Sequence, residues 1–188
     1  MGYFQNYNLS LLILISISLF FGASMKLADV FDEHGVKEYF YGAKILSGFV
    51  WGYLGALLIW YDLYVGSAIL AMILAYIVRM RIDYRNHAIG ATLVILAFLL
   101  FRNLDIISFF FFFGFFLIFG FMKDYFQYYS KKKKDLLNKN IIYNTIIWFY
   151  PISSFIYSLI YSRWSVFISL VSFNLAYALV KIYYQKRV

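Results

Sequence analysis

Long apolar stretches, each bounded by charged or polar residues, follow one another along almost the whole chain. Helices that cross a lipid bilayer need about 20 such residues. The pattern predicts seven helices of this kind, at residues 9–25, 45–61, 64–80, 88–101, 106–122, 141–161 and 164–181. It therefore predicts an all-α polytopic membrane protein, with one integral membrane domain over residues 1–188.

The run at 88–101 is short for a bilayer core that is about 30 Å thick. A tilted helix, or a bilayer that is thinner around the protein, accommodates a stretch of this length. If this run does not cross, six crossings remain and every later loop changes sides. The distribution of charged residues therefore distinguishes the two arrangements.

Basic residues gather on one side of the predicted bundle. With seven crossings, the loops at 25–44, 79–87 and 123–140 share a side with the C-terminus, and this side carries fifteen of the seventeen Lys and Arg. Only Arg102 and Arg163 lie on the other side. The positive-inside rule then predicts an outside N-terminus and a cytoplasmic C-terminus. We expect the protein to lie in the cell membrane, with the three loops facing the cytoplasm.

Composition supports a membrane protein and excludes some kinds of chemistry. The chain is 64% hydrophobic and only 14% charged, and a soluble core of 188 residues cannot bury that much apolar surface. The absence of cysteine excludes disulfides, thiolate metal ligands and a cysteine nucleophile. The net charge of +8 does not predict nucleic-acid binding, because the basic residues flank apolar runs and form no separate basic domain.

Four consecutive lysines follow the fifth predicted helix, at Lys131, Lys132, Lys133 and Lys134. A polybasic stretch beside a membrane binds anionic lipid headgroups, at about 1 kcal/mol per charge. We therefore expect membrane lipids as partners of this loop, with recruitment of an acidic partner as the alternative. The sequence defines no oligomeric state.

Two short polar stretches on the predicted cytoplasmic side carry both histidines of the chain and four of its nine carboxylates. They are Asp29-Val30-Phe31-Asp32-Glu33-His34 and Arg81-Ile82-Asp83-Tyr84-Arg85-Asn86-His87. If the first helix continues to Gly35, Asp29 and Glu33 stand one helical turn apart, and Asp83 and His87 have the same spacing. Because like charges at this spacing repel, we expect a cation to offset the acids.

The residue types in these stretches predict a site for a lipid phosphate or diphosphate. A divalent ion held by carboxylates, with guanidinium groups beside it, neutralises the charge that develops during phosphate cleavage or transfer. Oxygen ligands without sulfur favour Mg²⁺ or Mn²⁺, with zinc as the alternative. The predicted roles are metal binding by Asp29, Glu33, His34 and Asp83, proton transfer by Asp32 or His87, and phosphate binding by Arg79, Arg81 and Arg85.

Other interpretations compete with an enzyme. Arg79, Arg81 and Arg85 can pair with the acids of the first stretch and fix the helix ends without any ligand. A small-solute transporter or channel is the second possibility, although the charges cluster at the ends of the predicted helices and not at their middle. The third is an assembly subunit of a membrane complex that has no catalysis of its own.

Overall fold

The computed structural model describes residues 2–33, 40–102, 104–133 and 149–185. All regular secondary structure in these residues is α-helix, which confirms the predicted all-α class for this part of the chain. The helices are α1 (Gly2–Glu33), α2 (Ala43–Tyr61), α3 (Leu63–Val78), α4 (Arg85–Phe101), α5 (Ile106–Lys133), α7 (Phe149–Tyr161) and α8 (Trp164–Gln185). Four of them extend into segments that the sequence predicts as loops: α1 and α5 end within the predicted loops at 25–44 and 123–140, and α2 and α4 begin within those at 25–44 and 79–87.

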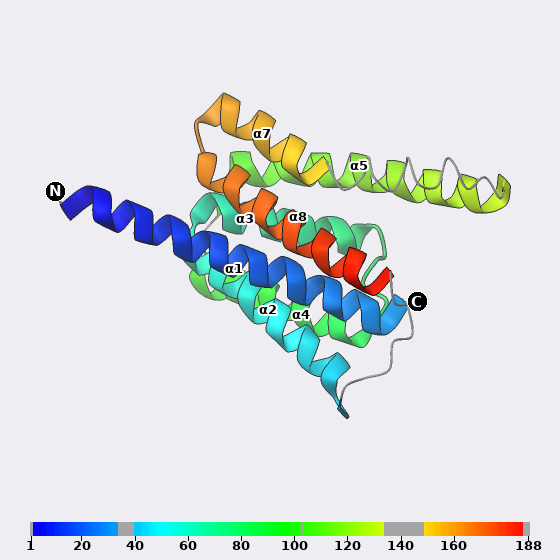
Figure 1. The fold of residues 1–188 in the computed structure, drawn as a ribbon. Helices are drawn as coiled ribbons and strands as arrows, with labels where there is room; N and C mark the ends of the chain where they lie inside the picture. Colours follow the sequence, from blue (N-terminus) through cyan, green and yellow to red (C-terminus); the bar gives the residue numbers. More distant parts are fainter. Residues whose placement is uncertain (1, 34–39, 103, 134–148, 186–188) are drawn as a thin grey trace.

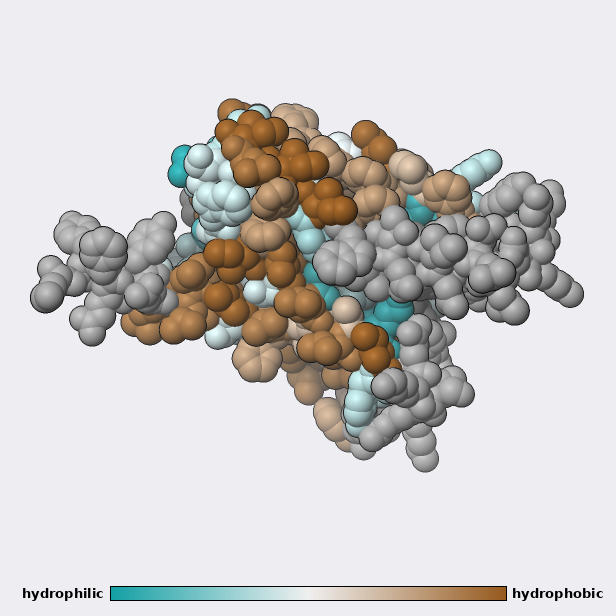
Figure 2. All heavy atoms as spheres, turned by 45° about the horizontal axis from the view of Figure 1, so that its top comes forward, coloured by the Kyte–Doolittle hydropathy of each residue, from teal (hydrophilic) through white to brown (hydrophobic). Residues whose placement is uncertain are grey.

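Four of the described helices are long and apolar enough to cross a membrane. Their candidate spans are Leu9–Phe31, Ala43–Tyr61, Ile106–Phe126 and Trp164–Tyr184. The helices α3 and α4 are also apolar but are shorter, with 16 and 17 residues. Hydrophobic residues cover most of the coloured surface in Figure 2. The protein is therefore a helical protein whose apolar helices suit integration into a membrane, and its seven crossings and its orientation stay predictions.

Consecutive helices run in opposite directions (Figure 1), and where the structure describes the whole connection between two of them, that connection is short. One residue, Asp62, separates α2 from α3, and two residues separate α7 from α8. Left-handed backbone conformations turn the chain where α3, α4 and α7 end, at Met80, Arg102 and Ser162. As a result α1, α3, α5 and α8 all run toward one end of the bundle. We call this end, which includes the connection at 79–84, the basic end.

The helix α3 forms the centre of the bundle. Ten of its sixteen residues are buried, and it contacts α2, α4, α5 and α8. Small side chains at Ala68, Ala71 and Ala75 are among the buried ones, and small residues let neighbouring helices approach closely. Around this centre, α1 packs against α2 and α8, while α5 and α7 lie together on the other side (Figure 1).

Glycines bring α2 and α4 into backbone contact. A Cβ atom on Gly48 would lie 2.5 Å from the carbonyl oxygen of Asn86, and one on Gly52 would lie 2.7 Å from the Cα of Gly90. Only glycine leaves room for this approach, because real Cβ contacts are longer. The approach brings the first turn of α4 into the interior of the bundle at the basic end.

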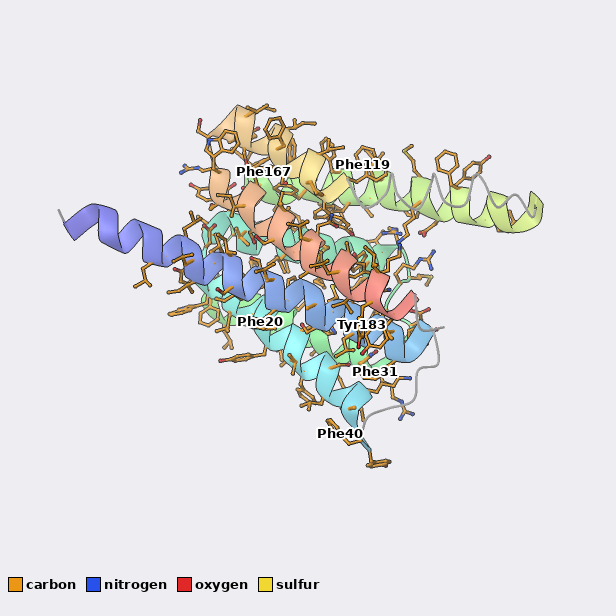
Figure 3. The ribbon with its side chains drawn as sticks, viewed as in Figure 1. Phe20, Phe31, Phe40, Phe119, Phe167 and Tyr183 are labelled. Carbon is orange, nitrogen blue, oxygen red and sulfur yellow. The ribbon has the colours of Figure 1, made fainter. Side chains whose placement is uncertain are left out.

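A similar approach joins α1 to α8. A Cβ atom on Gly22 would lie 2.1 Å from the carbonyl oxygen of Phe173, and the hydroxyl oxygens of Ser18 and Ser169 lie 2.7 Å apart. Both helices then continue to the basic end, where Phe31 and Tyr183 mark them in Figure 3. The end of α1 therefore lies between α8 on one side and α2 with α4 on the other.

Candidate functional site

Asp29 and His87 bring the two polar stretches of the sequence together. Oδ1 of Asp29, near the end of α1, lies 3.1 Å from Nε2 of His87, in the first turn of α4. The preceding residues also meet, since Nδ2 of Asn86 donates a hydrogen bond of 3.2 Å to the carbonyl oxygen of Ala28. Two adjacent residues of α4 thus contact two adjacent residues of α1, which fixes the relative position of the two helices.

The carboxylate of Asp29 has two more partners. Nζ of Lys26 lies 3.3 Å from Oδ2, and the hydroxyl of Tyr177 on α8 donates a hydrogen bond of 2.5 Å to the same oxygen. Lys26 and Asp29 are only 4% and 7% exposed, and Nζ of Lys26 lies 5.1 Å from the centre of the Tyr177 ring. Burying an unpaired charge costs several kcal/mol, so these partners stabilise the carboxylate. We call Lys26, Asp29, His87 and Tyr177 the Asp29 cluster.

Lys26 is a cation beside Asp29, where the sequence predicts that a cation offsets the acids. In the sequence it counts only among the basic residues of the predicted loop at 25–44, and it has no predicted role in the site. A signal was present, since Lys26 is the one charged residue between positions 9 and 28, and ionisable groups within apolar stretches are functional candidates. Tyr177 has no predicted role either, because nothing in the sequence distinguishes it from the other eighteen tyrosines.

Aromatic rings surround the imidazole of His87. The ring of Trp51 on α2 meets it edge to face, with ring centres 6.4 Å apart, and Tyr84 contacts it in a similar way at 6.0 Å. Trp51 lies over Gly90, whose lack of a side chain makes room for the indole. The indole Nε1 is buried and has no hydrogen-bond partner within the described part of the chain. These rings hold the imidazole in one orientation and keep it out of bulk water.

The arginines predicted to bind phosphate do not gather around Asp29. Nε and Nη2 of Arg79 donate hydrogen bonds of 3.1 and 2.9 Å to Oδ2 of Asp124 on α5, and Arg81 pairs with Oδ1 of the same residue. Arg85 is exposed at the beginning of α4. The contacts of Arg79 and Arg81 with Asp124 therefore hold the connection at 79–84 against α5. Asp124 is not among the predicted site residues, because the sequence predicts a loop at 123–140.

The predicted metal ligands are only partly described. Asp83 is exposed in the connection between α3 and α4. The side chains of Asp32 and Glu33 and all of His34 lie outside the described part of the chain. Among the described side chains, no three of His, Cys, Asp or Glu come together as a candidate metal site. Metal binding by Asp29, Glu33, His34 and Asp83 therefore stays a prediction.

The predicted lipid-binding lysines also lie beyond what the structure describes. The backbone of Lys131, Lys132 and Lys133 forms the end of α5, but their side chains and all of Lys134 fall outside the described part. Binding of anionic headgroups at this place stays a prediction as well.

The Asp29 cluster has the parts of an acid–base site. A carboxylate in contact with an imidazole orients the ring and stabilises the positive charge that forms when the ring takes a proton. A site away from water strengthens this interaction. Comparison with known protein families, curated proteins and solved structures finds no match to the chain. The fold and the cluster together define a helical, membrane-type protein with a buried charged site at one end.

Proposed function

We propose that the protein is a membrane-embedded enzyme that acts on the phosphate or diphosphate group of a lipid at the basic end of the bundle. The contact between Asp29 and His87 carries this proposal. A purely structural ion pair needs only Lys26 to neutralise Asp29. The carboxylate nevertheless has an imidazole and a phenol as further partners, and both are groups that transfer protons in enzymes.

His87 transfers the proton in this proposal, and Asp29 orients its ring. Arg85 lies in the same turn of α4 as His87 and binds the phosphate. The side chain of Tyr84 does not cap this helix. The N–H of His87 donates to Oδ1 of Asn86, and the other amides of a helix N-terminus favour an anion. Asp32 is the alternative proton-transfer group, as the sequence predicts. The headgroup of the lipid then lies at the basic end, with its chains along the apolar helices.

Mg²⁺ or Mn²⁺ is part of the proposal, with Asp29, Glu33, His34 and Asp83 as its ligands. Lys26 already lies 3.3 Å from Asp29, so Glu33, His34 and Asp83 would provide most of the ligands. Such an ion stabilises negative charge on the phosphate oxygens and the leaving group.

The proposal is tested with the purified full chain in liposomes. Phosphatidic acid, a polyprenyl phosphate and a polyprenyl diphosphate are each supplied, with Mg²⁺, with Mn²⁺ or with EDTA, and released phosphate is measured. We expect release from at least one lipid, and a decrease of about 10²- to 10⁴-fold in His87→Gln, the range typical of a lost acid–base group. The variant Tyr53→Phe on the exposed face of α2 is the matched control and keeps full activity.

Release no faster than in liposomes without protein, for all three lipids and under all three conditions, overturns the proposal. Full activity of the His87→Gln variant shows that His87 does not transfer the proton. Uptake of a small solute by the same liposomes, without phosphate release, supports the transporter instead.

A further inference from the structure

A pocket of about 60 Å³ lies between α3, α5 and α7, apart from the Asp29 cluster. One wall is aromatic and includes Phe115 and Phe119 of α5 and Phe149 of α7. Phe119 lies where α5 approaches the beginning of α7 (Figure 3), and its ring stacks on that of Phe149 with centres 4.2 Å apart. The polar part of the lining includes Arg79 and Lys123. The pocket thus joins an apolar wall to a cationic end.

The guanidinium group of Arg79 is positioned by Gly120. A Cβ atom on Gly120 would lie 2.3 Å from Nη1 of Arg79, so the bare glycine allows the guanidinium to lie against α5. Nε and Nη2 contact Asp124, whereas Nη1 makes no hydrogen bond within the described part. Because Arg79 and Arg81 share the one carboxylate of Asp124, these three residues carry a net positive charge.

Two tyrosines add a further donor to the pocket. The hydroxyl oxygens of Tyr76 and Tyr150 lie 2.7 Å apart, and both residues line the pocket. Each hydroxyl has one proton, and their mutual hydrogen bond uses only one of the two. The pair therefore still has one O–H to donate. Together with Nη1 of Arg79 and the positive charge of Lys123, this O–H suits a ligand made of negatively charged acceptors.

We propose that this pocket binds the phosphate group of an acidic membrane lipid. Guanidinium and ammonium groups bind phosphate strongly, and the phenyl rings of the wall suit the apolar part that follows a lipid headgroup. The outer face of α5 exposes large apolar side chains such as Phe110 and Ile118, as expected of a surface in contact with lipid. Free phosphate shares the same chemistry but has nothing to place against the aromatic wall.

The test measures binding of phosphatidic acid to the full chain in detergent, by native mass spectrometry. Diacylglycerol with the same acyl chains and inorganic phosphate are the comparison ligands. We expect phosphatidic acid to bind at least tenfold more tightly than diacylglycerol. We also expect Lys123→Gln to weaken it about fivefold, which corresponds to about 1 kcal/mol per cation. Lys44→Gln, which removes a lysine outside the pocket, is the matched control and leaves affinity unchanged.

A pair of glycine variants tests the position of Arg79 without any change of charge. Gly120→Ala places a methyl group where the guanidinium lies, and we expect at least fivefold weaker binding. Gly114→Ala on the same helix meets no atom within 4 Å and leaves binding unchanged. Because neither substitution alters charge, lipid bound at Lys131–Lys134 does not affect the comparison.

Equal affinities for phosphatidic acid and diacylglycerol, or wild-type binding by both Lys123→Gln and Gly120→Ala, overturn the inference. Displacement of phosphatidic acid by an equal concentration of inorganic phosphate overturns the assignment to a lipid. The measurement records binding and no turnover. A protein that binds phosphatidic acid in this pattern but releases no phosphate therefore supports this inference while it refutes the proposed function.

Discussion

Oδ1 of Asp29 on α1 lies 3.1 Å from Nε2 of His87 on α4, although the two residues are far apart in the chain. The contact depends on a third helix. Gly48 and Gly52 let α2 meet the backbone of α4, and α2 also packs against α1. The glycines of one helix therefore determine whether the charged residues of two others can meet.

The first prediction concerns the charge balance of the Asp29 cluster. Lys26→Met removes the ammonium that lies 3.3 Å from the buried carboxylate. We expect a loss of roughly 3 kcal/mol in unfolding free energy, since breaking a buried ion pair leaves a charge without compensation. The measurement is unfolding in mixed micelles of increasing SDS content, followed by circular dichroism.

The double variant Lys26→Met with Asp29→Asn is the control for this experiment. It leaves no isolated charge, so we expect it to be more stable than Lys26→Met alone. If the effects of the two substitutions simply add, Lys26 does not stabilise Asp29.

The second prediction concerns the approach of α2 to α4. Gly48→Ala places a Cβ atom 2.5 Å from the carbonyl oxygen of Asn86, so the helices must move apart. We expect a loss of about 1–3 kcal/mol, the usual cost of an overpacked interior. Thermal unfolding in detergent measures the loss. Gly114→Ala, where the added methyl meets open space, is the control. A melting temperature for Gly48→Ala equal to that of the control contradicts this packing.

The helices were predictable from sequence because hydropathy alone marks them. The sequence predicts a helix at 45–61, and α2 spans Ala43–Tyr61. It predicts another at 88–101, and α4 spans Arg85–Phe101. A continuous apolar run of about 20 residues in a membrane forms a helix, because a helix satisfies the backbone hydrogen bonds within the segment itself. The boundaries differ where a helix continues past its apolar run, as α5 does up to Lys133.

The partners of the charged residues were less predictable. The sequence placed Asp29 and His87 on the same side of the bundle, but the contact between them depends on helix packing. Arg79 pairs with Asp124 because α5 packs on α3 and continues beyond the apolar run. Tyr177 reaches Asp29 because Gly22 brings α8 against α1. Which helices become neighbours is a property of the whole bundle, and no local pattern encodes it.

The third prediction concerns the hydroxyl pair of Tyr76 and Tyr150, whose oxygens lie 2.7 Å apart. Tyr76→Phe or Tyr150→Phe leaves one hydroxyl without its partner, and we expect each to cost about 1 kcal/mol of unfolding free energy. The double variant removes both hydroxyls, so we expect it to cost less than the sum of the two. The SDS titration measures all three variants. Strict additivity indicates that the two hydroxyls do not interact in the folded protein.

The fourth prediction concerns the number of crossings and uses the absence of cysteine from the chain. Tyr41→Cys introduces a thiol at the basic end, and Ser162→Cys introduces one at the opposite end. Both positions are exposed. With seven crossings and the positive-inside orientation, an impermeant maleimide labels only Ser162→Cys in intact bacterial cells. In inverted vesicles it labels only Tyr41→Cys.

The same two variants distinguish seven crossings from six. If α4 does not cross, every later connection changes sides, and the thiol of Ser162→Cys lies on the same side as that of Tyr41→Cys. Equal labelling of both variants in one preparation therefore indicates six crossings and removes α4 from the membrane-spanning helices. If the two thiols are labelled from opposite sides but Tyr41→Cys is the one that reacts in intact cells, the protein has seven crossings and the opposite orientation. In that case the Asp29 cluster lies at the outer surface, and its proposed lipid substrate belongs to the outer leaflet.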